Sequence, residues 1–300
     1  MYYTYQTILK IEDSIDALGD LGFHIKLKKN MFFLLAGCYF SLQKEYGESD
    51  SVMIRCFQRN RNREEAVQKV RYAMEYFIFL TGAPYDTNDY LIESTEMTLP
   101  YIDINLSRKR MLELQVADNA YRRIRKKKEL LENALHLYST AVKLNFLFDE
   151  KQCEDAFFAF FKVIEIIVKD DFLIEKNNIE RKNDLMQAYV TKILHNIYNI
   201  ETANEKLLDI SGKMGKILFD IVFDGIYHKI IWFSKKHNIK IDCNKLSTIV
   251  KVRNAIAHGD KVSFEEYLEE YRYTVFLSRQ VILAKFFDLK FPKIPVEIKV

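Results

Sequence analysis

The chain of 300 residues is 49% hydrophobic and 29% charged, a composition typical of globular proteins and compatible with one large domain or two moderate ones. Its 9 glycines and 4 prolines are few, which argues against a turn-rich β-sandwich and favours a mainly α-helical protein. The formal net charge of +3 does not by itself indicate a nucleic-acid partner, because affinity for phosphates comes from local clusters of lysine and arginine.

The cysteines and apolar runs restrict where the protein works. The four cysteines, at positions 38, 56, 153 and 243, are far apart and include no CxxC pair, so we expect neither a zinc site nor a disulfide framework. The apolar run MFFLLAGCYF at residues 31–40 is about half as long as a membrane-spanning helix and lies too far into the chain for a signal peptide. We therefore expect a soluble, cytoplasmic protein without a cofactor, a metal or a membrane partner.

The N-terminal part mixes strand and helix patterns. Short segments rich in β-branched and aromatic residues predict strands at residues 2–11, 23–29, 51–57 and 98–106. Between the last two, apolar residues recur at three- and four-residue spacing over residues 63–80, which predicts one amphipathic helix ended by Gly82 and Pro84. We interpret residues 1–115 as an α+β domain.

The remainder, residues 116–300, has the pattern of an all-helical bundle, because no proline occurs between Pro100 and Pro292 and Leu, Ile, Lys and Glu are abundant. We expect helices near residues 117–147, 152–170, 182–198, 204–236, 244–258 and 263–288. Asp149, Ser211 and Ser263 are candidate caps or breaks, and Ser263 is followed by a glutamate at position 266, as in a capping box. Without a long flexible linker, the two parts are expected to pack together.

A candidate site lies in VRNAIAHG, residues 252–259. Gly259 is suited to the left-handed residue that ends a helix, which places His258 in the last turn, where the helix dipole favours a cation. Asn254 and His258 share a helix face, whereas Arg253 and His258 diverge by about 140° around the axis. Either His258 only caps the helix beside a solvated Arg253, or the two act together, through the long arginine side chain or across a partner helix.

The motif Arg253-Asn254-x3-His258, followed by Gly259, resembles the Arg-polar-x3-His signature of the HEPN superfamily. The upstream segment AFFAFFKVIEIIVKDD, residues 156–171, is similar to the Phe-rich helix with an embedded glutamate of the Apea-like branch. The resemblance covers about residues 117–290. It implies a helical domain that forms a homodimer with two motif copies facing each other and, in active members, a metal-independent endoribonuclease.

The residue types suit this chemistry. Histidine side chains in general exchange a proton near neutral pH, and the imidazole of His258 can act as the base that deprotonates a ribose 2′-OH. Arginine, here Arg253, carries a planar and permanent charge that can stabilise the negative charge developing on the phosphate. Asn254 can orient the imidazole or donate to a phosphate oxygen. Some HEPN toxins continue the motif as His-x-Tyr, with the tyrosine modified by a nucleotidyltransferase; here Gly259 and Asp260 follow His258, so we do not predict that control.

Glu165 lies in the most apolar helix, at the edge of its exposed strip of Asp155, Lys162 and Lys169. A carboxylate partly removed from water needs a cationic partner. We name Arg253 as that partner, which would make Glu165 a residue that positions the arginine. The alternative is a surface Glu165 paired with Lys162 or Lys169 at helical spacing.

Basic residues are most dense at residues 121–128. Such a run is either a solvated helix face or a contact for RNA phosphates leading to the site, and its candidate RNA-binding residues are Arg122, Arg123, Arg125, Lys126, Lys127 and Lys128. A second cluster, Arg59, Arg61 and Arg63, is equally ambiguous. Tyr121 and Tyr138 could stack on bases or belong to the core. His228 and His237, near Trp232, are expected to be packing residues.

These observations favour a cytoplasmic endoribonuclease with RNA as substrate. By the same resemblance it could be a toxin or antiviral defence effector that is held quiet until residues 1–115 sense a trigger. One alternative is a non-catalytic helical module that binds RNA or a partner protein. Another is an inhibitor or scaffold that contacts no nucleic acid.

Overall fold

The structure is a computed structural model that describes residues 3–12, 24–26, 31–45, 51–81, 93–95, 117–146, 150–174, 225–260, 262–287 and 297–299, together with the single helical positions 188, 192, 195, 196, 209 and 213. Over these residues the chain is mainly helical, and its sheet is built from the N-terminal part. Both features were predicted from composition and periodicity.

Five strands form an antiparallel sheet in the order β3-β4-β5-β1-β6. Their bounds are β1 Tyr3–Glu12, β3 Met31–Leu35, β4 Cys38–Glu45, β5 Ser51–Asn60 and β6 Glu93–Thr95. The strands predicted at residues 2–11 and 51–57 are confirmed as β1 and β5, which pair with each other along their whole lengths. The strand predicted at residues 98–106 lies outside the described residues.

The apolar run at residues 31–40, considered above only as a membrane segment, forms the β3–β4 hairpin. Ala36 and Gly37 turn the chain with φ of 51° and 81°, the two successive left-handed residues that a tight hairpin turn requires. Side chains then alternate between the two faces of the sheet, as the strand period of two dictates. Phe33 and Leu35 are buried, whereas Leu34 is 38% exposed.

A second, two-stranded sheet joins distant parts of the chain. Strand β2, His24–Lys26, was predicted within residues 23–29 and pairs in parallel with β7, Glu297–Lys299. The prediction of an all-helical block over residues 116–300 is therefore wrong at its end. The sequence there, VEIKV at 296–300, is β-branched and alternating, and its strand forms only because a partner from the N-terminal part is available.

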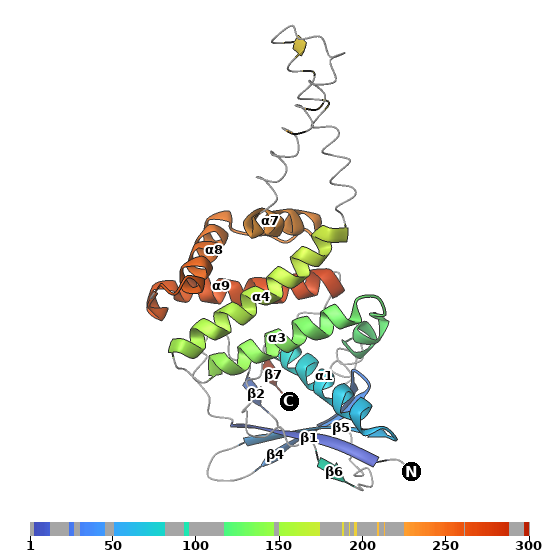
Figure 1. Ribbon diagram of the computed structural model, residues 1–300. Coiled ribbons are helices and arrows are strands. Elements are labelled where there is room, and N and C mark those ends of the chain that lie inside the picture. The colour runs from blue at the N-terminus through green and yellow to red at the C-terminus, as the bar shows by residue number, and fades with distance from the viewer. Residues whose placement is uncertain are drawn as a thin grey trace.

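The described helices with full bounds are α1 Arg63–Thr81, α3 Lys128–Phe146, α4 Glu150–Ile174, α7 Ile226–Lys236, α8 Cys243–Ala257 and α9 Leu268–Phe287, which the short 3-10 helix η3 Phe264–Tyr267 precedes. Figure 1 shows them in layers above the sheet: α1 and α3 lie next to it, α4 and α9 cross above them, and α7 and α8 lie farthest from the sheet. These helices match the predicted segments closely, except as follows.

Two helix predictions need correction. Residues 117–147 were expected to form one helix, but a helical stretch over 117–123 ends before α3 begins, because Lys127 adopts φ of 64° and breaks the ladder. Ser263 precedes η3 but its side chain makes no cap hydrogen bond, so the expected capping box is absent. Some predictions lie outside the described residues, apart from single helical positions. They are the helix at 182–198, the part of the helix at 204–236 before position 225, and the candidate caps Asp149 and Ser211.

One hydrophobic core runs from the sheet into the helices. Phe33 and Phe40 of the hairpin stack at 5.2 Å, and Phe77 of α1 stacks on Phe40 at the same distance. On the next face of α1, Phe79 contacts Tyr138 of α3 edge-on at 5.3 Å. The two parts of the chain therefore pack together, as expected, and the aromatic contacts bury Tyr138, which excludes it as a base-stacking residue.

A cap that we did not predict begins α8, the helix that carries the motif. The Asp242 side chain accepts hydrogen bonds from the backbone N–H groups of Asn244 and Lys245 at 2.9 and 3.1 Å.

We expect Asp242→Ala to lower the free energy of unfolding by about 1 kcal/mol, because two helix N–H groups lose their acceptor. Asp242→Asn is the matched control, since asparagine caps equally well, and urea denaturation of both variants would measure the difference. Equal losses in the two variants would contradict a capping role.

Candidate functional site

The motif helix α8 meets the Phe-rich helix α4 through an ion pair. The Arg253 Nη2 atom donates to Glu165 Oε1 at 3.1 Å. The Glu165 side chain is only 6% exposed and that of Arg253 is 31% exposed, so the ion pair lies within the contact between the two helices. The predicted contact between Glu165 and Arg253 is confirmed. This pair was predictable from the sequence because Glu165 lies at the edge of the apolar face of α4, where its carboxylate needs a cation from another element.

The alternative partners of Glu165 also contact it, on the other oxygen. Lys162 Nζ lies 3.3 Å and Lys169 Nζ 4.0 Å from Glu165 Oε2. Both lysines are one helical turn away on α4, as their spacing predicts. Glu165 therefore accepts a hydrogen bond from Arg253 on one oxygen and from Lys162 on the other, and Lys169 is an ion-pair partner of the second oxygen. The two predicted pairings coexist.

Further contacts fix the guanidinium of Arg253. Its Nη1 atom donates to Asn254 Oδ1 at 3.2 Å, and its central carbon lies 5.7 Å from the centre of the Phe161 ring. The Nε atom is buried and has no hydrogen-bond partner among the described residues. Asn254 thus contacts the arginine, whereas we had considered the imidazole or a phosphate. An arginine held by a carboxylate, an amide and a ring keeps one orientation, which is what stabilising a developing charge requires.

His258 occupies the end of the same helix. Gly259 has φ of 83°, as predicted, and its N–H donates to the Ile256 carbonyl while the Asp260 N–H donates to the Ala255 carbonyl, both at 3.0 Å. These two bonds form the Schellman motif that ends a helix. The turn leaves His258 exposed, and no described residue forms a side-chain hydrogen bond or ion pair with it. Within one copy, Arg253 and His258 share a helix but do not touch.

The basic run at residues 121–128 is not one continuous helix face, because the helix stops at residue 123. Three of its cations have acidic partners: Arg122 contacts Asp118 at 2.9 Å, Lys128 contacts Glu132 at 3.4 Å, and Lys127 pairs with Asp170. The other three, Arg123, Arg125 and Lys126, are exposed and have no ion pair with any described residue. Tyr121 is buried and so belongs to the core. Arg59, Arg61 and Arg63 are exposed where β5 leads into α1.

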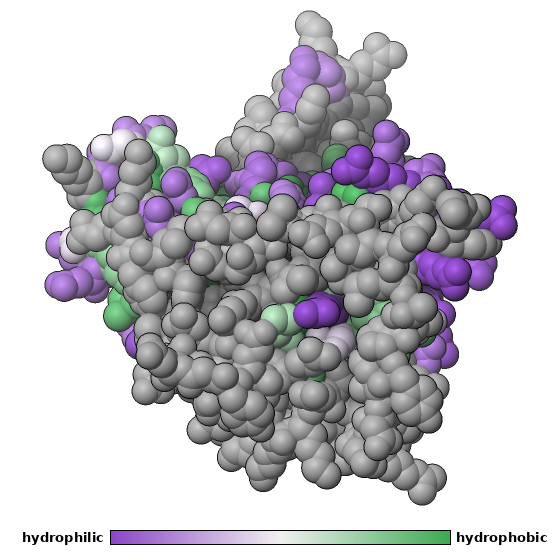
Figure 2. Space-filling view, turned by 90° about the horizontal axis from the view of Figure 1, so that it is seen from below, coloured by the Kyte–Doolittle hydropathy of each residue, from purple (hydrophilic) through white to green (hydrophobic). Residues whose placement is uncertain are grey.

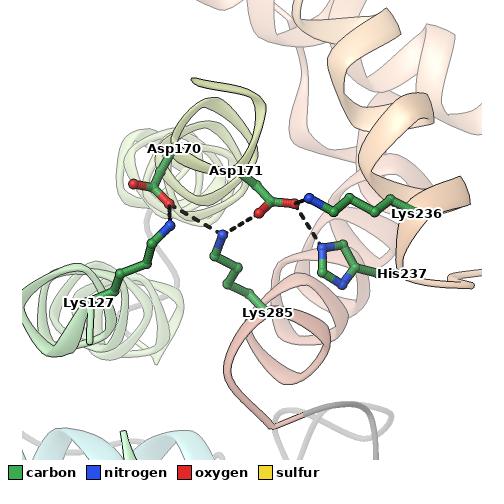
Figure 3. Close-up of polar contacts among 6 residues, drawn as sticks. All are labelled: Lys127, Asp170, Asp171, Lys236, His237 and Lys285. Atoms are coloured by element: carbon green, nitrogen blue, oxygen red, sulfur yellow. Dashed lines mark hydrogen bonds and ion pairs between the residues drawn. The ribbon is translucent and has the colours of Figure 1, made fainter. Parts of the chain in front are cut away.

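A second polar cluster, absent from our sequence-based predictions, lies at the far end of α4. Asp171 accepts from His237 Nε2 at 2.9 Å, is 3.2 Å from Lys236 Nζ and pairs with Lys285. Asp170 is 3.3 Å from Lys285 Nζ and also pairs with Lys127. Figure 3 shows the two carboxylates pointing to opposite sides of α4, with Lys285 between them. The cluster joins α4, α7, α9 and the turn before α3.

Electrostatics in this cluster serve stability. Burial opposes ionisation of Asp171, but the hydrogen bonds from His237 and Lys285 and the charge of Lys285 outweigh it and hold the pKa of Asp171 well below its ordinary value of 3.8. His237 also packs against Phe233, with ring centres 4.3 Å apart, so the packing role predicted for it is only part of its function. The sequence signal for this cluster was the pair Asp170 and Asp171 at the end of an apolar helix. Their carboxylates need either cationic partners or contact with water.

The two clusters differ in what they can do chemically. The side chains of Asp171 and Lys285 are 6% and 8% exposed, so they offer little surface to a substrate. Arg253 is partly exposed and His258 is exposed. The accessible cation and imidazole at the end of α8 are therefore the better candidate for chemistry, and the Asp171 cluster for structure.

No protein-family model, curated protein or solved structure matches the chain.

Across the described residues, no group of three or more His, Cys, Asp or Glu side chains is placed to hold a metal ion. No described helix is both long and apolar enough to cross a bilayer. On the lower side of the molecule, the described hydrophobic residues reach the surface in small patches among hydrophilic ones (Figure 2).

A test of the Glu165 contact follows from its geometry. If Glu165 positions Arg253 for RNA cleavage, Glu165→Ala should lower kcat by about 10²-fold, the usual effect of misplacing a catalytic group by an ångström. Glu165→Gln keeps an oxygen that can accept from Arg253 and should retain most of the activity. Steady-state cleavage kinetics of both variants, with circular dichroism to check folding, would measure this. Equal activity of the alanine variant and the unchanged protein would contradict a positioning role.

Proposed function

We propose that the protein is an endoribonuclease of the HEPN type that cleaves RNA at a composite site formed by two copies of the chain. The observation that carries this proposal is the fixed guanidinium of Arg253, held by Glu165 at 3.1 Å, five residues before an exposed histidine on the same helix. This combination of a preorganised cation with an imidazole that can act as a base matches what transesterification of RNA requires.

The proposed reaction uses the 2′-OH of the substrate as nucleophile. The imidazole of His258 takes the 2′-OH proton while the 2′-oxygen attacks the adjacent phosphorus. Arg253 stabilises the extra negative charge on the phosphate oxygens. The bond from phosphorus to the 5′-oxygen then breaks, and that oxygen takes a proton from an imidazolium or from water. The products are a 2′,3′-cyclic phosphate and a 5′-OH end. The resemblance implies that no metal ion takes part.

A second copy of the chain is part of the proposal. Arg253 and His258 diverge by about 140° around the helix, and Arg253 turns toward Glu165 on α4. An isologous dimer brings the same patch of both copies face to face. Arg253 of one copy can then act on the phosphate whose 2′-OH faces His258 of the other. This geometry explains why the two groups need not touch within a copy.

The alternative is a helical module that binds RNA or a partner protein without cleaving it. The observation in its favour is that one copy leaves His258 without a described side-chain contact that would orient it as a base. Incubating chelator-treated protein with labelled single-stranded RNA separates the two functions. Fragments ending in a cyclic phosphate support the nuclease, and binding without fragments supports a module that binds RNA. The absence of salt-dependent binding contradicts both of these and leaves a module that binds a partner protein.

The cellular setting is part of the same proposal and rests on the resemblance. A cytoplasmic toxin or defence effector would have to be inactive in resting cells. The sheet and α1 share one core with the helices, so a trigger sensed within residues 1–115 could reach the helical part through packed side chains.

A further inference from the structure

Three cations gather around one buried carboxylate beside the candidate site. Arg253, Lys162 and Lys169 all lie within 4.0 Å of an oxygen of Glu165. Among the described residues, Glu165 is the one carboxylate that either lysine contacts. A single negative charge cannot balance three positive ones, so the cluster has a local excess of positive charge.

The cations and the carboxylate differ in their access to solvent. The side chains of Lys162 and Lys169 are 55% and 52% exposed, that of Arg253 is 31% exposed, and that of Glu165 is 6% exposed. A molecule that approaches α4 from solvent therefore meets the ammonium groups first and the carboxylate last. The ligand that such a surface favours is an anion.

The contacts to Glu165 do not lock the lysines. Both lysines are more than half exposed, and Arg253 keeps its own ion pair with Glu165, so Lys162 and Lys169 can leave Glu165 without leaving its buried charge unpaired. Lysine is a compact charge on a flexible stem and binds phosphate without imposing one geometry. Arg253, by contrast, keeps its contacts to Asn254 and Phe161 and stays in place.

The spacing along α4 suits an extended anion. Lys162 and Lys169 are seven residues apart, which is about 10 Å along a helix axis, and Glu165, with its partner Arg253, lies between them. The two lysines can converge on one anion or reach separate phosphates of one strand. A strand held at both positions would pass the guanidinium of Arg253.

We propose that Lys162 and Lys169 form a phosphate-binding rim that holds single-stranded RNA on either side of the phosphate next to Arg253. This inference rests on the proposed function and names two substrate-binding residues for it. Because the rim contacts phosphates, it adds affinity without sequence preference.

The test is the salt dependence of RNA binding. The His258→Ala variant serves as background so that the RNA is not consumed, and a labelled single-stranded oligoribonucleotide is the probe. In this background, Lys162→Gln combined with Lys169→Gln should reduce the slope of log K against log salt by about 1.4, that is 0.7 for each lost phosphate contact. Affinity should fall by a similar factor for oligonucleotides of different sequence.

Two matched variants separate the rim from general charge effects. Lys69 and Lys213 also pair with carboxylates one helical turn away, Glu65 and Asp209, so replacing both with Gln removes the same charge and should leave the slope unchanged. Lys162→Arg with Lys169→Arg keeps both charges and should keep the slope. A slope equally reduced in the Lys69 and Lys213 variant would overturn the assignment to α4.

The outcomes also separate this inference from the function on which it rests. If the unchanged protein cleaves RNA but the Lys162 and Lys169 glutamine variant keeps the full salt slope, the rim is wrong and the nuclease stands. If the unchanged protein neither binds nor cleaves RNA, both are wrong.

Discussion

RNA cleavage should slow by about 10²–10⁴-fold when His258 is replaced by alanine, because this is the usual contribution of a general base. Arg253→Ala should lower the rate by about 10²–10³-fold, because the charge developing on the phosphate loses its preorganised donor. Both variants should fold. His258 is exposed, and in Arg253→Ala the Glu165 carboxylate keeps Lys162 at 3.3 Å. Initial rates on single-stranded RNA in the presence of a chelator would measure both losses.

The matched control for these variants lies on the same helix. Lys251 is exposed on α8, two residues before Arg253, and Lys251→Ala removes one positive charge without touching the candidate site. Its activity should stay close to that of the unchanged protein. Cleavage that survives in His258→Ala, in protein free of contaminating nuclease, would show that the base lies elsewhere.

Replacement of Asp171 by asparagine should have the largest effect on stability. The Lys285 side chain is 8% exposed, and its more buried ion-pair partner is Asp171, which is 6% exposed. Removing one member of a fully buried ion pair lowers the free energy of unfolding by about 3–5 kcal/mol, and because Lys285 keeps the more exposed Asp170 at 3.3 Å, we expect a loss at the lower end of that range. Asp170→Asn is the control: its side chain is 33% exposed and its loss should cost below about 1 kcal/mol. Urea denaturation would compare them, and equal losses would contradict the central role of Asp171.

Acid should remove the same contribution. The pKa of Asp171 is lower in the folded protein than its ordinary value of 3.8, because the hydrogen bonds from His237 and Lys285 and the charge of Lys285 outweigh burial. A carboxylate of this kind stabilises the fold above its unfolded pKa, and the stabilisation is lost as pH falls below about 4. The difference in unfolding free energy between the unchanged protein and Asp171→Asn should therefore be full at pH 6 and shrink below about pH 4. A difference that stays constant on acidification would mean that Asp171 is not ionised in the folded protein.

Local patterns predicted much of the fold. The helix α8 and its glycine end followed from NKLSTIVKVRNAIAHG, because apolar spacing and a left-handed glycine are local signals. The pair between Glu165 and Arg253 followed from the position of one carboxylate on the edge of an apolar face. Both are cases in which the physical requirement of a residue limits its partners to a few.

Other features depend on contacts that no local pattern specifies. Strand β7 exists because β2 offers it a partner from nearly the other end of the chain. At the break before α3, Lys127 adopts a left-handed conformation. The sequence has no glycine at this position that would have indicated the break. The Asp171 cluster assembles side chains from four places along the chain, and only the three-dimensional packing of α4, α7 and α9 brings them together.

Complementation between two inactive chains tests the composite site most directly. Arg253→Ala keeps His258, and His258→Ala keeps Arg253. If equal amounts exchange subunits, half of the dimers contain one chain of each kind, and each of these has one intact pairing across the interface, about a quarter of the full number of sites. We predict that the mixture recovers about that fraction of the normal cleavage rate although neither chain cleaves alone. A mixture that stays inactive while native mass spectrometry shows mixed dimers would contradict a site shared between two copies.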